Sequence, residues 1–386
     1  MTARLAREPA SSVAGDGTGA VSRLELRAFR NYRRLDLAVG AGPVVLFGPN
    51  GAGKTNLLEA LSLLAPGRGL RRARLAELDN RAGGHFRIRA RVETADGPRE
   101  VVTWHEAASG RRAVAVDGTA GRSSADLARI CAAVWLTPAM DRILIEGPAG
   151  RRRFLDRLTL ALYPDHAARV SAFERAMRER AHLLRTRRPD PVWLDALERR
   201  MAEAAVAVAA ARRDLLTGLE TELARGVEGF PGARLSVVGE VEERLARATA
   251  LEVEEWLAAR LAASRAADAE SGGAAHGTHR SDLLVFAREG EVPAAACSTG
   301  QQKALLLAIL LAETRLRRAR TGDWPLLLLD EVAAHLDAAR REALFAALLG
   351  LGAQCWLTGT DAGLFRPLFG RAAVFHVNEA TLSEHG

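Results

Sequence analysis

Two kinds of hydrophobic pattern divide the chain. Apolar and polar positions alternate with a period of two in four segments of the N-terminal third: 21–28, 86–93, 100–106 and 112–117. This alternation predicts half-buried strands. Asp-Gly pairs at 96–97 and 117–118 predict hairpin turns. We therefore expect a partly antiparallel sheet in this third of the chain.

A helical pattern dominates the middle of the chain. From about residue 125 to 265 the sequence is rich in Ala, Arg, Leu and Glu, with few Gly or Pro, as in 173–185 and 193–227. These residues favour helices. The stretch RPDP at 188–191 predicts a break between two helices. SGGAAHGT at 271–278 predicts a flexible linker.

The C-terminal part alternates between apolar runs and helical segments. SDLLVFA, PLLLLD and QCWLTGT have the character of strands, and 300–318 and 338–348 that of helices. Strands that alternate with helices predict a parallel sheet. A short apolar run, PVVLFG at 43–48, predicts a further buried strand. The fold class is therefore α/β with a mixed sheet and an inserted, mostly helical lobe.

Composition narrows the class of protein. With 386 residues, of which 48% are hydrophobic, the chain is long enough for one large or two smaller cores. No apolar run approaches the ~20 residues of a membrane span, so we expect a soluble, cytoplasmic protein without a membrane partner. The three cysteines lack metal-ligand spacing. The net charge of +7 is compatible with nucleic-acid binding, but also with a general bias toward arginine.

The stretch GPNGAGKT at 48–55 matches G-x-x-x-x-G-K-[ST]. Glycines let the backbone wrap a phosphate, and the helix that follows directs its unpaired amides at the same anion. Lys54, one of only two lysines, supplies a charge between the β- and γ-phosphates, and Thr55 a ligand for Mg²⁺. The motif predicts ATP binding with Mg²⁺. The predicted nucleotide contacts here are Gly48, Asn50, Gly51, Gly53, Lys54, Thr55 and Asn56.

Two carboxylates end the apolar run 325–329. Asp330 is a candidate for holding Mg²⁺, and Glu331 for polarising the attacking water as a general base. Together with Lys54, Glu331 forms the predicted catalytic pair. An ordinary strand followed by an acidic helix start is the alternative, which the neighbouring phosphate loop disfavours.

A second small polar cluster precedes the helix at 300–318. Ser298, Gly300 and Gln301 form an S-x-G-Q motif, about 30 residues before the acidic strand end. Alone, such a cluster is an ordinary helix cap. Tyr32, upstream of the first site strand, is a candidate for stacking on adenine, with a surface or core tyrosine as the alternative.

These motifs, in this order, resemble the ATP-binding-cassette superfamily. The stretches LRAFRNYRRLDL, GRGLRRARLAEL, EGPAGRRRFLDR, THRSDL and STGQQKALLLAILLAE further resemble the RecF family of bacterial recombination-repair ATPases. The resemblance covers nearly the whole chain after residue 20. It implies an ATPase domain formed by 21–125 and 275–386, a helical lobe at 126–274 that carries a DNA or partner surface, and a disordered tail at 1–20.

The resemblance also implies a function. The chain would dimerise on ATP, with the S-x-G-Q helix of one subunit capping the γ-phosphate held by the other, and Asp337 across the interface. It would bind double-stranded DNA and single-strand/double-strand junctions. With RecO and RecR it would promote loading of RecA, and slow hydrolysis would reset the complex.

Two expected residues are missing from the cassette pattern. The stretch 134–147 contains no Q-loop glutamine, and no switch histidine follows CWLTGTD. Thr358 or Thr360 is a candidate for the γ-phosphate sensor, with a plain strand-to-loop threonine as the alternative.

Four other functions are alternatives for a chain with these motifs. They are an SMC- or Rad50-like chromosome ATPase, a transport ATPase subunit, a nuclease-type ATPase and a non-enzymatic scaffold. The helical insertion is too short for the long coiled coils of the first. The separation of about 240 residues between Lys54 and Ser298 is too long for the second. The third needs an additional acidic metal cluster, and intact Asp330 and Glu331 disfavour the last.

Two arginine clusters are candidates for DNA contact through backbone phosphates rather than base edges. A solvated basic surface is the alternative for both. The residues are Arg68, Arg71, Arg72, Arg74, Arg151, Arg152 and Arg153.

Overall fold

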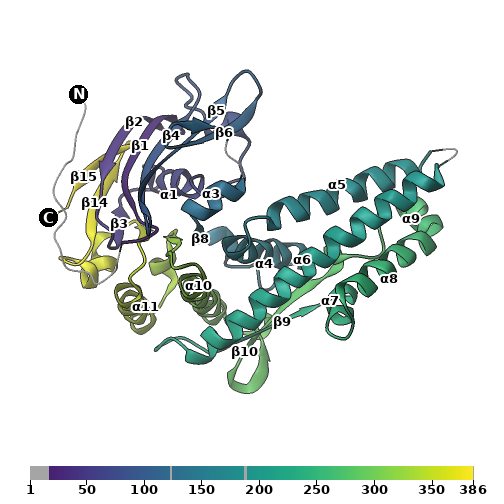
Figure 1. Ribbon diagram of the computed structural model, residues 1–386. Coiled ribbons are helices and arrows are strands. Elements are labelled where there is room, and N and C mark those ends of the chain that lie inside the picture. Colours follow the sequence, from purple (N-terminus) through teal and green to yellow (C-terminus); the bar gives the residue numbers. More distant parts are fainter. Residues whose placement is uncertain (1–16, 122–123, 187–188, 386) are drawn as a thin grey trace. The chain divides into compact units, whose positions relative to one another are not determined.

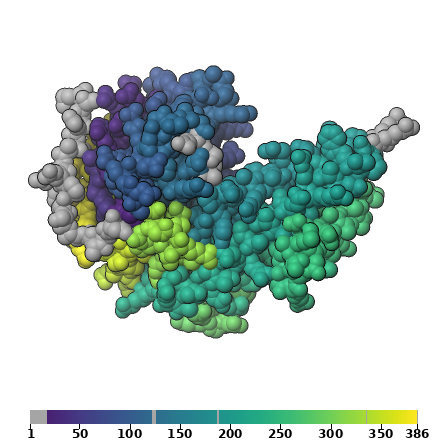
Figure 2. Space-filling view, viewed as in Figure 1, coloured from purple at the N-terminus to yellow at the C-terminus, as the bar shows by residue number. Residues whose placement is uncertain are grey.

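The structure, a computed structural model, describes residues 17–121, 124–186 and 189–385, which form two compact units (Figure 1). We call them the sheet unit (Met1–Asp141, Arg225–Gly232 and Ser298–Gly386) and the helical unit (Arg142–Ala224 and Ala233–Cys297). In the space-filling view, the purple N-terminal and yellow C-terminal segments gather in one body, the sheet unit (Figure 2). The mixed α/β fold with a helical insertion is confirmed.

A mostly parallel sheet lies at the centre of the sheet unit. Only β15, at one edge, pairs antiparallel with its neighbour. The strands β8, β12 and β13 are buried along their whole length, because a parallel sheet covered on both faces needs continuous apolar runs such as Leu326–Leu329. The order is β15 (Thr381–Glu384), β14 (Ala373–Asn378), β3 (Val44–Phe47), β13 (Cys355–Gly359), β12 (Leu326–Leu329) and β8 (Ala133–Leu136).

An antiparallel sheet forms the second layer of strands in this unit (Figure 1). In β4, arginines at the exposed positions alternate with buried Ile88, Ala90 and Val92, as the period of two predicts. The order is β2 (Tyr32–Ala38), β1 (Val21–Phe29), β4 (Arg87–Thr94), β5 (Gly97–Glu106), β6 (Arg111–Val116) and β7 (Thr119–Ala120).

Helices complete the sheet unit. The longest of them, α10, is buried along much of its length, because its apolar residues surround the helix axis instead of forming one stripe. The helices are α1 (Lys54–Ser62), α2 (Leu75–Leu78), α3 (Ser124–Ile130), α10 (Thr299–Thr321) and α11 (Ala338–Leu351). Three 3₁₀ segments follow strands: η1 (Pro138–Met140), η5 (Val332–His335) and η6 (Ala362–Leu368).

The helical unit has its own core, which includes Phe173, Met201 and Leu257. Its longest helix, α6, has 35 residues, which at 1.5 Å per residue is about 50 Å. The helices are α4 (Pro148–Leu162), α5 (His166–Leu184), α6 (Pro191–Arg225), α7 (Glu240–Leu245), α8 (Ala250–Ala263) and α9 (Arg265–Ser271). The strands are β9 (Ala233–Val238), β10 (Asp282–Ala287) and β11 (Val292–Pro293), with 3₁₀ segments η2 (Thr278–Arg280), η3 (Glu289–Glu291) and η4 (Ala294–Ala296).

The unit boundaries differ from the expected ones at both ends of the insertion. Residues 126–141 belong to the sheet unit, because β8 pairs with β12 at the edge of the parallel sheet. Residues 275–297 belong to the helical unit, because β10 pairs with β9, a strand that the helical composition did not predict. Strand pairing between distant segments therefore decided both boundaries.

The predicted linker and the described end of the predicted tail, residues 17–20, are both packed against the fold. The predicted linker at 271–278 is fastened by carboxylates: Asp268 accepts from the amide of Ala275 at 2.9 Å, and Glu240 from that of Gly277 at 3.0 Å. In the predicted tail at 1–20, residues 1–16 lie outside the described residues, whereas Ala20 is buried against the sheet unit. Within the described ranges, no helix is both long and apolar enough to cross a membrane.

Candidate functional site

The phosphate-loop motif lies between β3 and α1, where backbone geometry demands glycine. Gly48 has φ 147°, and a Cβ there would collide with the carbonyl of Val377. Gly53 has φ 119°, and a Cβ would lie 2.7 Å from the hydroxyl of Tyr32. Gly51 also has a positive φ, 80°, but its Cβ would face open space. The loop is thus packed against the protein at its two ends and open at its middle, as an anion-binding loop requires.

Lys54 is the first residue of α1 and is almost fully buried. Its Nζ donates to the carbonyls of Gly48 at 2.7 Å and Pro49 at 2.9 Å, so the side chain arches over the loop. Burial lowers the pKa of Lys54, and the negative charges of Glu331 and Asp330 oppose that shift. The predicted lysine and the predicted carboxylates therefore lie within electrostatic reach of one another.

Asp330 connects the loop helix to two strands of the parallel sheet. Its Oδ1 accepts from the hydroxyl of Thr55 at 2.9 Å and from that of Thr358 at 2.7 Å. The Thr358 hydroxyl in turn accepts from the amide of Glu331 at 2.9 Å. Hydroxyl and carboxylate oxygens are the donors that Mg²⁺ prefers, so Thr55 and Asp330 fit a magnesium ion. Thr358 holds both carboxylate-bearing residues in place.

Glu331 has a left-handed backbone, with φ 53°. This conformation is uncommon for a residue with a long side chain. It ends β12 abruptly and leads into η5. The turn separates the Glu331 side chain from the buried strand while Thr358 holds its amide.

Tyr32 packs against the phosphate loop from the protein interior. Its side chain is completely buried, and its hydroxyl donates to the carbonyl of Gly53 at 3.2 Å. Asn31 donates to the carbonyl of Ala52 at 3.1 Å and accepts from Asn56 at 2.8 Å. A ring without exposed area has no face for adenine, so the stacking prediction for Tyr32 is wrong, and of its two alternatives the core tyrosine holds.

A carboxylate on α1 ties the first arginine cluster to the phosphate-loop helix. Glu59 is buried and accepts two bonds of 2.9 Å from Arg30. Arg71 donates to Glu59 at 3.0 Å and to Asn56 at 2.8 Å. Arg68, Arg72 and Arg74 are exposed on the same connection, as the DNA-contact hypothesis requires.

Two of the three arginines of the second cluster form hydrogen bonds within the helical unit. Arg151 forms a bidentate pair with Asp282, at 2.8 and 2.7 Å, and Arg152 donates to the carbonyl of Ser281 at 2.7 Å. Arg153 is exposed. Arg151 and Arg152 therefore connect α4 to β10 and its preceding residue, a role that the charge run did not reveal.

The S-x-G-Q residues start α10 with a reciprocal capping box. Ser298 accepts from the amide of Gln301 at 3.3 Å, and Gln301 accepts from the amide of Ser298 at 2.9 Å. Ser298 and Gln301 are exposed. A Cβ at Gly300 would lie 3.4 Å from the guanidinium of Arg340, next to Asp337, which caps α11. The motif thus presents an exposed helix start whose cap comes from its own side chains.

The second lysine also lies near the acidic strand end. Lys303, in the first turns of α10, is buried, and its Nζ is 3.4 Å from Asp141, just after η1. Burial lowers the pKa of Lys303, while Asp141 and Glu331 raise it. Asp141 lies in the segment 134–147, where the cassette pattern places the Q-loop residue. The sequence motifs did not predict the Lys303–Asp141 pair, although a chain with only two lysines could have marked Lys303 as a candidate.

With this geometry in place, comparisons with known proteins identify the family. The model described as the RecF/RecN/SMC N terminal domain matches residues 20–379. The DNA replication and repair protein RecF of Mesorhizobium japonicum is 46% identical over 368 residues, which cover 94% of this chain and 97% of that protein. This chain belongs to the RecF family. The RecF of Rhizobium meliloti is also 46% identical, with 94% and 98% covered. The chain is thus an ATPase of the RecF/SMC type and a member of a DNA replication and repair family.

Solved structures support the fold independently. The recombination mediator protein RecF-ATPrS in the RecFOR pathway matches with a TM-score of 0.84 at 22% identity, covering 95% of this chain and 98% of that one. The RecF-ATP structure of the same pathway gives 0.80. An Smc head domain from Pyrococcus furiosus matches less closely, at 0.53 and 13% identity. The order of these scores places the architecture nearer to RecF than to the SMC heads.

Proposed function

We propose that this chain binds and hydrolyses ATP with Mg²⁺ at the phosphate loop, and that nucleotide state controls its binding to DNA during repair in the cytoplasm. The observation that carries the proposal is Asp330, which accepts from the Thr55 hydroxyl at 2.9 Å. That bond joins the phosphate-loop helix to the acidic strand end, two features that lie far apart in the sequence.

Each residue of the site has a role in this proposal. The amides of the loop and of the start of α1 bind the β-phosphate. Lys54 neutralises charge between the β- and γ-phosphates, and Thr55 and Asp330 hold the metal. Glu331 orients and deprotonates the attacking water. The metal, when bound, neutralises charge that develops on the phosphate oxygens.

We further propose that two chains complete each other's sites. The helix start at Ser298, Gly300 and Gln301, of which Ser298 and Gln301 are exposed, has the dipole and amides to receive the γ-phosphate bound by a partner subunit. Such an arrangement makes ATP part of the dimer interface. Hydrolysis then releases the partner and resets the complex.

Exposed arginines supply the proposed DNA contact. Arg68, Arg72 and Arg74 lie on the connection that follows α1, and Arg71 links it to Glu59 of that helix. Guanidinium groups on such a connection suit phosphate contacts without base readout. Double-stranded DNA at single-strand junctions, with RecO and RecR as partners in RecA loading, is the function we infer from the family.

The proposal is tested by ATP turnover with and without gapped duplex DNA, alongside light scattering during size-exclusion chromatography with ATP. Lys54→Met should abolish nucleotide binding. Glu331→Gln should bind ATP and accumulate as a dimer, because the ground state forms while water activation fails. A Glu331→Gln protein that stays monomeric at saturating ATP would contradict capping by a partner subunit. Turnover that ignores DNA would contradict the DNA-linked role.

A further inference from the structure

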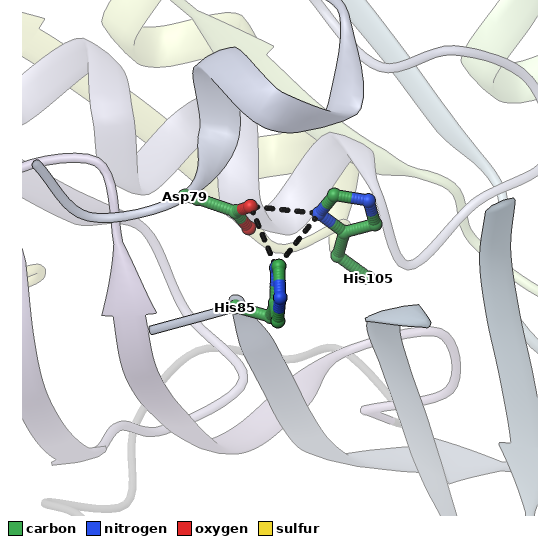
Figure 3. Close-up of side chains that lie close together, drawn as sticks. All are labelled: Asp79, His85 and His105. Carbon is green, nitrogen blue, oxygen red and sulfur yellow. Dashed lines mark hydrogen bonds and ion pairs between the residues drawn. The ribbon is translucent and has the colours of Figure 1, made fainter. Parts of the chain in front are cut away.

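Two histidines and an aspartate outside the ATP site converge on one point of the sheet unit (Figure 3). Asp79 ends α2, His85 precedes β4, and His105 lies on β5. The Nδ1 atoms of His85 and His105 are 2.9 and 2.7 Å from the same oxygen, Asp79 Oδ2. The two Nδ1 atoms are 3.3 Å from each other.

The spacing of these three atoms is near that of ligands on a shared metal ion. Zinc binds imidazole nitrogen and carboxylate oxygen at about 2.0–2.2 Å, so neighbouring ligand atoms lie about 3.0 Å apart in octahedral and about 3.3–3.6 Å apart in tetrahedral coordination. The two ring nitrogens are 3.3 Å apart, which is within this range. Their distances of 2.9 and 2.7 Å to Asp79 Oδ2 are hydrogen-bond lengths, and a bound metal would replace those bonds and widen both distances slightly.

The carboxylate is oriented by the backbone beneath it. Asp79 Oδ1 accepts from the amide of Phe86 at 2.9 Å, which turns Oδ2 toward the imidazoles. Burial alone would raise the pKa of Asp79, but the hydrogen bonds from Phe86 and the two histidines hold it below its ordinary value. A fixed, ionised carboxylate beside imidazoles is the kind of support that metal ligands have in proteins.

A short loop returns the chain from Asp79 to His85. Gly83 and Gly84 both have a positive φ, 108° and 98°, and a Cβ at Gly84 would come within 3.2 Å of Ala28. The Asn80 side chain fastens the loop, accepting from the amide of Ala82 at 2.9 Å and donating to the carbonyl of Arg30 at 2.8 Å. The loop conformation therefore places His85 over Asp79 by backbone constraints that do not involve the histidine itself.

The cluster is open to solvent on one side. The His85 side chain is 53% exposed, whereas those of His105 and Asp79 are 10% and 16% exposed. The two imidazole rings are nearly perpendicular, at 80°, with centroids 4.7 Å apart. The His85 side therefore offers a cation access from solvent, with room for water to complete its coordination.

We propose that Asp79, His85 and His105 form a binding site for a divalent transition metal, with Zn²⁺ as the preferred ion. Two imidazoles and one carboxylate suit Zn²⁺, Co²⁺ and Ni²⁺ better than Mg²⁺, which prefers oxygen ligands. The site is separate from the Thr55–Asp330 magnesium position. Its metal fastens the Asp79–His85 loop to β5, and so stabilises the antiparallel sheet where it supports Arg30 and the phosphate-loop helix.

The test uses the full-length chain without an affinity tag, treated with a chelator and free of nucleotide. Zn²⁺ is titrated calorimetrically, and Co²⁺ is followed by its visible absorption. We expect one equivalent to bind, with Co²⁺ bands typical of nitrogen and oxygen ligands and a higher Tm with Zn²⁺. His85→Gln removes a direct ligand and should weaken binding by at least about 100-fold, the upper range seen when only an outer-shell partner of a ligand is lost. Its side chain is half exposed, so this variant should fold normally.

A matched variant on another element controls for adventitious binding. His182 is an exposed histidine on α5, and His182→Gln should leave the affinity, the cobalt spectrum and the zinc-dependent Tm unchanged. The proposal is overturned if wild-type protein binds no Zn²⁺, or if His85→Gln and wild type bind it equally. Either result would make the three side chains a hydrogen-bonded cluster only. Asp79→Asn, which keeps the shape, should reproduce the loss seen with His85→Gln.

Discussion

At the scale of single residues, the ATP site depends on one threonine that no motif contains. Thr358, at the end of β13, is fully buried and touches both acidic residues of the site. Its hydroxyl is used twice, as a donor to Asp330 and as an acceptor from the amide of Glu331. Because both bonds are made within the protein, we infer that the Thr358 hydroxyl positions Asp330 and Glu331 and does not contact a phosphate. Thr360 is exposed and keeps the proposed sensor role.

Replacing this hydroxyl by a methyl group tests the positioning role. Thr358→Val keeps the volume but removes both bonds, so we expect ATP affinity to hold and turnover to fall by about 10–100-fold, as for other residues that orient metal-site groups. Steady-state turnover as a function of Mg²⁺ concentration measures this, because a misplaced Asp330 also raises the metal requirement. Thr360→Val is the neighbour control. A larger loss in Thr360→Val than in Thr358→Val would reverse the two assignments.

At the scale of elements, the helices of the helical unit are joined by a buried charge network. Arg180 on α5 donates to Glu198 on α6 at 2.9 Å and to Asp268 on α9 at 2.7 Å. It also donates to the carbonyl of Leu261 on α8 at 2.6 Å. All three charged side chains are at most 2% exposed. One guanidinium therefore connects four helices.

Removing the Arg180 guanidinium should lower the free energy of unfolding substantially. Arg180→Met leaves Glu198 and Asp268 buried with fewer partners, and breaking such a pair typically costs about 3–5 kcal/mol of unfolding free energy. Arg178, two residues before Arg180 on α5, forms an exposed pair with Glu174 at 3.7 Å. Arg178→Met should change the unfolding free energy by less than about 1 kcal/mol. Urea unfolding followed by circular dichroism compares the two variants, and equal effects would contradict the network's importance.

The same network predicts a dependence on pH. Burial would raise the pKa of Asp268, but bonds from Ser264, Arg180 and the Ala275 amide lower it below its ordinary value. A lowered pKa in the folded state gives stability that is present above the unfolded pKa of about 3.9 and lost as the pH falls through the folded value. Asp268→Asn should therefore be less stable than wild type at pH 7, with the difference shrinking in acid. Unfolding midpoints measured across this range check the sign, and a constant difference would contradict it.

At the scale of the whole molecule, the proposed capping makes activity a property of two chains. In the proposed dimer, each site would combine the phosphate loop of one subunit with the S-x-G-Q helix of the other. The capping box keeps this helix start formed in the single chain. The partner therefore meets a preformed anion-binding end, which limits the ordering cost of association.

Mixing two inactive chains tests this arrangement. Lys54→Met destroys the phosphate loop, and Ser298→Arg blocks the capping helix, so each homodimer should lack turnover. In a mixed dimer, one site combines the intact parts of both chains. With independent sites and random pairing in a symmetric dimer, an equimolar mixture should recover roughly a quarter of wild-type turnover. A mixture no more active than its components would contradict capping between subunits.

The sequence by itself predicted the ATP site and determined most of the elements that surround it. GPNGAGKT, the apolar run before Asp330 and the S-x-G-Q helix start are local signals, since loop conformation, strand burial and helix capping depend on neighbouring residues. Alternation of strand and helix predicted the parallel sheet for the same reason. These signals were also sufficient to carry the resemblance to the RecF family.

Only the tertiary structure decided how distant residues meet. The Thr55–Asp330 bond spans 275 positions, and Lys303 meets Asp141 across 162. Tyr32 was ambiguous because an aromatic ring next to a loop gives no local sign of burial, and the unit boundaries depended on which strands β8 and β10 joined. Asp79, His85 and His105 come together because a turn and an antiparallel pairing bring them to one point. Such contacts depend on long-range packing, which period and spacing do not encode.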